Sequence, residues 1–284
     1  MLQKIRNATY QYAIPSAVVI AILFYGIMLG VSELLLLLPS STVTSYLKII
    51  VGMLYPVGFM IFFGFSNAFR SKKFFKGLVC GIVLVVMQII VLLSFFVTAA
   101  EDSATVWNSW DGILMGLLFV IGIGVREECV FRGTIQNILA KKYASSIKGI
   151  WITAIVSAVI FGLIHLFNIL AGVDAVPAII QSLTNFGIGL FYAALYLRSG
   201  NIWVMISIHA LTDTAGLASS VFLANQSETE VISSLSVATL ISGLVFVGVS
   251  IFLLRPSKCK EILARFGCEC GEPANKLSAD ATVA

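Results

Sequence analysis

Eight long apolar segments, separated by short polar connections, make up most of this 284-residue chain. They cover approximately residues 12–38, 43–66, 75–99, 110–140, 149–173, 177–198, 201–225 and 231–254. A helix needs about 20 apolar residues to cross the hydrocarbon core of a bilayer, and each segment has roughly that length. The pattern therefore predicts an all-α protein, a membrane bundle of about eight transmembrane helices over residues 1–255.

The composition excludes several classes of protein. Hydrophobic residues make up 59% of the chain and charged residues only 11%, whereas a soluble domain carries about 25% charged residues. A water-soluble enzyme, a disordered chain and a nucleic-acid-binding protein are excluded on this ground. The lipid bilayer is the expected partner, and the sequence carries no indication of the oligomeric state.

Basic residues mark one side of the predicted bundle. Fifteen of the 18 Lys and Arg residues precede the first segment, follow the last one, or lie in the second, fourth and sixth connections. Because Lys and Arg concentrate in cytoplasmic loops, this alternation predicts an even number of spans with both termini in the cytoplasm. Residues 256–284 show no clear apolar period and are expected to form a partly disordered cytoplasmic tail.

Four ionisable residues, Arg126, Glu127, Glu128 and Arg132, interrupt the fourth apolar segment. A charge at the centre of a membrane helix costs about 2.5–3.5 kcal/mol on insertion scales, so such groups persist where they pair or line a wet cavity. Glu128 and Arg132 are four residues apart with the acid first, which favours an ion pair on one helix face. Glu127 lies about 100° around the helix and is left to face another element.

Both histidines of the chain, His165 and His209, also lie in apolar segments, and Asp213 follows His209 by one helical turn. Counted from the nearest basic connection, Glu127 lies about 21 Å deep, His165 about 26 Å, His209 about 17 Å and Asp213 about 23 Å. Similar depths on three helices predict that these four side chains meet in one polar pocket. Helix packing is the competing explanation for each residue taken singly, and it is the expected role of Phe161.

A pocket of Glu, His and Asp side chains suits acid–base catalysis. A carboxylate beside a histidine can take a proton from water and direct the resulting nucleophile to a carbonyl group. A second histidine can stabilise the oxyanion that develops. Glu127, His165 and His209 would also suit zinc. The His-Glu-x-x-His helix of many zinc peptidases is absent from the sequence, however, so a zinc site lacks its strongest sequence signature and is not favoured.

Three motifs occur in order along the chain, each within an apolar segment, and together they span about residues 110–215. This ordered set resembles the CAAX-protease and bacteriocin-processing family, also called CPBP or Abi, which includes the type II CAAX prenyl endopeptidases. The motifs are Glu127-Glu128-x-x-x-Arg132, Phe161-x-x-x-His165 and His209-x-x-x-Asp213.

The resemblance implies an eight-helix intramembrane endopeptidase that is glutamate-dependent and needs no metal. By motif, Glu127 and His165 would activate the attacking water, and His209 and Asp213 would help build the oxyanion site. The remaining motif residues would support this site; they are Glu128, Arg132 and Phe161. The family's third motif often ends in Asn, and a carboxylate donates no hydrogen bond unless protonated. Fixing the tautomer of His209 is therefore the role expected of Asp213.

The resemblance also implies a substrate and a location. The substrate would be a membrane-associated or lipidated protein or peptide that enters the bundle, and the location would be a bacterial or archaeal plasma membrane. Two alternatives stay open. One is a non-enzymatic bacteriocin self-immunity or membrane scaffold protein of the same family. The other is a proton-coupled transporter with a Glu and His relay, which the lack of an internal repeat disfavours.

Overall fold

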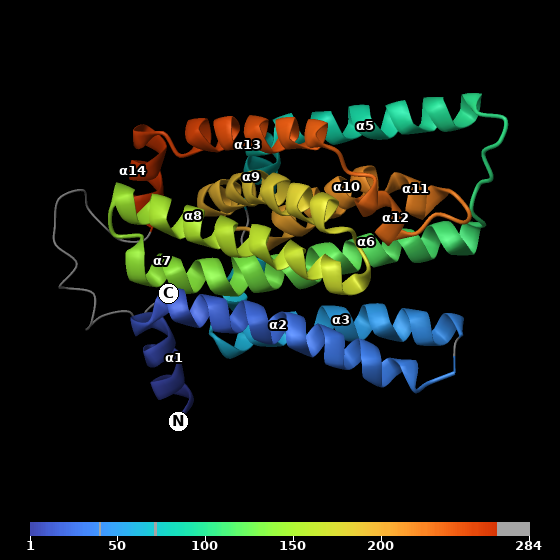
Figure 1. The fold of residues 1–284 in the computed structure, drawn as a ribbon. Helices are drawn as coiled ribbons and strands as arrows, with labels where there is room; N and C mark the ends of the chain where they lie inside the picture. The colour runs from blue at the N-terminus through green and yellow to red at the C-terminus, as the bar shows by residue number, and fades with distance from the viewer. Residues whose placement is uncertain (40, 71–72, 266–284) are drawn as a thin grey trace.

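The computed structural model describes residues 1–39, 41–70 and 73–265, and every regular element in these ranges is helical. Most of the helices run nearly parallel and form one elongated bundle, while α1 (Leu2–Gln11) and α14 (Pro256–Arg265) lie across one end of it (Figure 1). The prediction of an all-α helix bundle is confirmed.

Each predicted apolar segment forms one or more helices. The first three become α2 (Ala13–Leu36), α3 (Thr42–Phe62), and α4 (Phe74–Cys80) with α5 (Ile82–Glu101). The fourth becomes α6 (Trp110–Val130), the π-helix η2 (Phe131–Gln136) and α7 (Asn137–Tyr143). The fifth and sixth become α8 (Ile147–Ile164) with η3 (His165–Ala171), and α9 (Ala175–Ser199). The last two become α10 (Ile202–Gly216) with α11 (Ala218–Phe222), and η4 (Val237–Thr239) with α13 (Leu240–Leu253). Two short helices occupy connections: η1 (Ser66–Arg70) and α12 (Glu228–Ser233).

Five helices of the described chain are long and apolar enough to cross a membrane: Ala13–Leu35, Thr42–Phe62, Ile82–Glu101, Ile147–Ala171 and Ala175–Ser199. A sixth span results if Val237–Leu253 and Pro256–Ala264, which are bent by 64°, are counted together. Of the eight predicted transmembrane spans, five or six are therefore supported. The segments around α6 and α10 fall short because α6 carries several charges and α10 has only 15 residues.

The basic connections gather at one end of the bundle. The Arg6 side chain donates to the carbonyl oxygen of Phe62 at the end of α3, and the Lys141 ammonium lies 4.5 Å from the centre of the Tyr10 ring. Arg198 at the end of α9 donates to the carbonyl of Leu253 at the end of α13. Figure 1 shows α1, α7 and α14 at this end. The placement of this end in the cytoplasm stays a prediction.

Helix α14 occupies the first ten residues of the segment expected to be an irregular tail. Cys259, Ile262 and Leu263 are buried against the bundle. Their spacing of three and four residues places them on one helix face. This amphipathic pattern is short, and it is much weaker in the sequence than the long apolar segments. The rest of the expected tail, residues 266–284, lies outside the described residues.

Helix α9 is the centre of the bundle and packs against α8, α10 and α13. The crossing with α13 is close: a Cβ atom added at Gly187 would overlap the carbonyl oxygen of Gly243, and one added at Gly243 would lie 3.1 Å from Cα of Thr184. Small residues at a helix crossing let two backbones approach in this way.

We expect Gly187→Ala to lower the thermal unfolding temperature of the purified protein, because the added methyl group must push α9 and α13 apart. Overpacking of a well-packed site costs about 1–3 kcal/mol. Gly248→Ala is the matched control, since Gly248 lies on α13 with no atom within 4 Å of an added Cβ. An equal loss in both variants would contradict the close crossing.

Candidate active site

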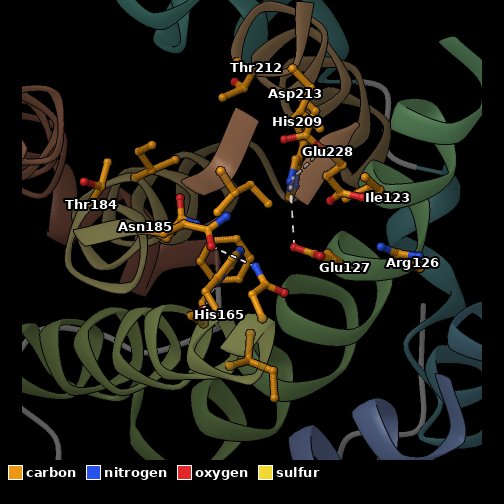
Figure 2. A pocket seen from close by; sticks show the side chains of 18 of the residues that line it. Ile123, Arg126, Glu127, His165, Thr184, Asn185, His209, Thr212, Asp213 and Glu228 are labelled. Atoms are coloured by element: carbon orange, nitrogen blue, oxygen red, sulfur yellow. Dashed lines mark hydrogen bonds and ion pairs between the residues drawn. The ribbon is translucent and has the colours of Figure 1, made fainter. Parts of the chain in front are cut away.

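A cavity of about 220 Å³ brings together the four side chains predicted to share a pocket (Figure 2). Glu127 comes from α6, His165 from the junction of α8 and η3, and His209 and Asp213 from α10. Figure 2 shows Glu127 facing His209, while His165 lies on another side of the same cavity. The catalytic roles of these residues stay predictions.

Helices α6 and α10 approach closely beside this cavity. A Cβ added at Gly124 would lie 3.1 Å from the carbonyl oxygen of Ile206 and 3.7 Å from Cβ of Ala210. Helix α10 begins after Asn201, whose side chain accepts hydrogen bonds from the backbone N–H groups of Trp203 and Val204. Such a cap defines where a helix starts. The contact at Gly124 and the fixed start together place the second half of α10 opposite the acidic end of α6.

Three carboxylates surround the imidazole of His209. Nδ1 lies 2.6 Å from Oε1 of Glu128, while Nε2 lies 3.5 Å from Oδ2 of Asp213 and 3.8 Å from Oε2 of Glu127. An ionised carboxylate only accepts hydrogen bonds, so Nδ1 donates to Glu128. The contact at Nδ1 that orients His209 thus comes from Glu128. The sequence predicted Asp213 for this role, but Asp213 lies one turn further along α10 and faces Nε2.

Glu128 and Arg132 form the ion pair that their spacing predicts. Nη1 of Arg132 lies 3.0 Å from Oε1 of Glu128, and both side chains are fully buried. The guanidinium also donates to the carbonyl oxygen of Gly189 on α9. Arg132 lies in the π-helix η2, which continues α6; such π-helical turns are frequent at functional sites. Glu128 therefore has two buried partners, Arg132 and His209, and links α6 to α10.

His165 is held by its own helix. Its Nδ1 lies 2.8 Å from the carbonyl oxygen of Phe161, one turn earlier. Because a carbonyl oxygen only accepts, Nδ1 carries the hydrogen, and Nε2 of the neutral ring is an acceptor. Among the described residues, no carboxylate oxygen lies within 4.0 Å of either ring nitrogen. Glu127 and His165 therefore share a cavity without touching, and the carboxylate approaches His209 instead.

Aromatic rings form the inner wall of the site. The Phe161 ring lies 5.0 Å from the His165 ring and 6.0 Å from the His209 ring, centre to centre. The Arg132 guanidinium lies 4.2 Å from the centre of the Phe161 ring and 5.0 Å from that of Tyr192. Phe161 therefore packs, as predicted, and it packs against both histidines. Tyr192, which carries no motif, donates its hydroxyl hydrogen bond to Thr212 on α10.

Two charged residues line the cavity without a role predicted from the sequence. Arg126 precedes the motif acids on α6, and its Nε is buried and has no hydrogen-bond partner in the described part of the chain. Glu228 reaches the cavity from α12, in a connection where the sequence shows only an acidic loop. Burial raises the pKa of the Glu228 carboxyl above its usual range, and Arg126 partly opposes this rise. An intramembrane charge was a signal for Arg126; no sequence signal pointed to Glu228.

Zinc binding in proteins requires three or four donor side chains grouped around one point. In the part of the chain that the structure describes, no three His, Cys, Asp or Glu side chains are grouped so that they could hold a metal ion. Glu127, His165 and His209, the zinc ligands considered from the sequence, share the cavity but do not form such a group.

The raised pKa of Glu228 predicts a pH-dependent stability. A carboxyl whose pKa is higher in the folded state stabilises the fold below its unfolded pKa and loses that contribution as the pH rises. Glu228→Gln should therefore raise the unfolding temperature more at about pH 8 than at about pH 5, since ordinary Glu titrates near 4.3. Thermal unfolding of the purified protein at both pH values measures the difference.

Glu230→Gln is the control for this experiment, on the same short helix. Hydrogen bonds from Ser227 lower the pKa of the exposed Glu230 carboxyl, so this residue is ionised at both pH values. The effect of Glu230→Gln should be the same at each. A pH-independent effect of Glu228→Gln would contradict the buried position of Glu228.

One comparison with known proteins relates this geometry to a family. Residues 108–215 match the family model described as type II CAAX prenyl endopeptidase Rce1-like. No curated protein matches the chain, and no solved structure matches it. The matched region contains all three motifs and the helices that carry them, and it coincides with the core predicted at about 110–215. The chain is thus a membrane protein whose residues 108–215 are similar to the Rce1-like type II CAAX prenyl endopeptidases, in agreement with the resemblance that its three motifs predict.

Proposed function

We propose that this protein is an intramembrane endopeptidase in which Glu127 activates a water molecule to hydrolyse a peptide bond. The observation that carries the proposal is the position of the Glu127 carboxylate. Glu127 lines the cavity, and its Oε2, which has no hydrogen-bond partner among the described residues, lies 3.8 Å from Nε2 of His209. A buried carboxylate oxygen with free acceptor capacity can bind water and take its proton.

The hydrolytic step follows from these positions. Glu127 takes a proton from water, and the water oxygen forms a bond to the carbonyl carbon of the substrate. The carbon–nitrogen bond then breaks, and the proton passes to the leaving nitrogen. His165, whose Nε2 is an acceptor, can hold the second hydrogen of the water. These roles require only short proton transfers between groups that line one cavity.

His209 suits the stabilisation of the oxyanion. Its Nδ1 donates to Glu128 and its Nε2 faces the carboxylates of Glu127 and Asp213. A ring protonated on both nitrogens donates in both directions, so Nε2–H can donate to a negative charge that develops in the cavity. Glu128, held by Arg132, keeps the ring in this orientation. Fixed donors of this kind contribute strongly because they need no reorganisation during the reaction.

An apolar groove beside the cavity supports a membrane-embedded or lipidated substrate. The groove has a volume of about 510 Å³ and lies between α2 and α8, with only hydrophobic residues along it. Ile164 lines both the groove and the polar cavity. A substrate with an apolar chain or segment can therefore lie in the groove while its peptide bond reaches Glu127.

Substitution of Glu127 tests the proposal. Glu127→Gln keeps the size of the side chain but removes the proton acceptor, so we expect cleavage to fall by about 10²–10⁴-fold. The measurement is mass spectrometry of peptide libraries, prenylated and unprenylated, incubated with the reconstituted protein. Glu33→Gln is the control, because Glu33 is an exposed acid on α2 outside the cavity.

Two results would overturn the proposal in different ways. Undiminished cleavage by Glu127→Gln would show that another group activates the water. No cleavage by the unsubstituted protein across both libraries would favour a self-immunity or scaffold function. In either case the unfolding temperature of each variant must match that of the parent protein, so that loss of folding is not mistaken for loss of chemistry.

A further inference from the structure

A second cavity lies next to the catalytic one, between α2, α3 and α6, and it plays no part in the proposed reaction. Its volume is about 540 Å³, within the range of about 300–1,000 Å³ typical of ligand pockets. Met28 and Arg126 line both cavities and so form the wall between them. The Arg126 guanidinium leans towards the second cavity, 5.9 Å from the centre of the Phe119 ring.

The cavity is long and mainly apolar in its inner part. It follows one face of α6 from Gly112 to Arg126, a stretch of about 21 Å at 1.5 Å per residue. Met115 and Phe119 lie along this face, and Ile49 of α3 lies opposite them. Both α2 and α3 are candidate membrane spans with exposed apolar side chains on their outer surfaces. The bilayer therefore borders the helices that enclose the cavity.

The other end of the cavity is polar and positively charged. Ser32, Ser45 and Lys48 line it near the ends of α2 and α3, and Asn108 lines it just before the start of α6. No Asp or Glu is among the described residues that line this cavity. None of the described side chains lies within ion-pair distance of the Lys48 ammonium. The cavity thus offers a long apolar body and one uncompensated cation at its polar end.

We propose that this second cavity binds an anionic membrane lipid, with an acyl chain along α6 and the negatively charged headgroup at Lys48. The Lys48 ammonium favours a negatively charged group, and the long apolar part of the cavity favours an acyl chain. The position of Lys48 near the helix ends matches the depth of lipid headgroups. The bound chain would contact Met28 and Arg126, which also line the catalytic cavity. The proposal does not depend on the proteolytic function.

The test uses two photoactivatable lipids with the same acyl chains, phosphatidylglycerol and phosphatidylcholine, added to the full-length protein in detergent micelles. Mass spectrometry should map the crosslinks of the anionic lipid to α3 and α6. Lys48→Met should reduce the preference for phosphatidylglycerol by about fivefold, the value of a partly exposed ion pair. Lys142→Met, at an exposed basic residue outside the cavity, should leave the preference unchanged.

A second pair of variants tests whether lipid labelling requires the open volume of the second cavity. Gly52 lines the cavity, and an added Cβ there meets no atom within 4 Å, so Gly52→Phe should fill the cavity and abolish labelling. Gly58→Phe is the matched control on the same helix, since Gly58 is exposed, equally unobstructed and outside the cavity. Equal labelling by both lipids, or full labelling of Gly52→Phe, would overturn the proposal. If Gly52→Phe slows peptide cleavage without changing lipid labelling, the cavity holds the peptide substrate and the lipid proposal is wrong.

Discussion

The fully buried carboxylate of Glu128 is the interaction on which the site depends. In a membrane bundle such a charge is costly unless it is paired, and removal of one partner of a buried pair costs about 3–5 kcal/mol. Glu128 has two partners, since Arg132 and His209 both lie within 3.0 Å of its Oε1. Arg132 in turn donates to the backbone of α9. One carboxylate thereby joins three helices and sets the direction of the His209 ring.

The same constraint explains the arrangement of the bundle. The ionisable side chains of the site lie mainly on α6 and α10, the two predicted segments that do not qualify as membrane spans by length and composition. Apolar helices surround them, with α2, α3, α5 and α8 exposing many large hydrophobic side chains. The outer helices therefore supply much of the exposed apolar surface of the bundle. Between these layers lie two adjoining cavities: one is rich in acids, and the other has Lys48 and Arg126 but no acid among the described residues that line it.

Local rules predicted a large part of the site. The four-residue spacing of Glu128 and Arg132 predicts their ion pair, and the depth count predicts that Glu127, His165 and His209 reach one level of the bundle. These predictions succeed because helical periodicity and membrane thickness act along a single helix. They fail for contacts between helices. Glu128 rather than Asp213 holds Nδ1 of His209, because that contact depends on how closely α6 and α10 approach at Gly124.

By itself, the sequence determined that the chain is a helical membrane protein, where its apolar segments lie and which few charged residues stand inside them. Hydrophobic length and charge patterning are properties of short windows, so no tertiary information is needed for them. Only the tertiary structure decided that Glu228 enters the cavity of Glu127 and the two histidines from a distant connection and that Arg126 separates two cavities. Both depend on helix crossings, whose angles and distances are set by side-chain packing across the whole bundle rather than by any one segment.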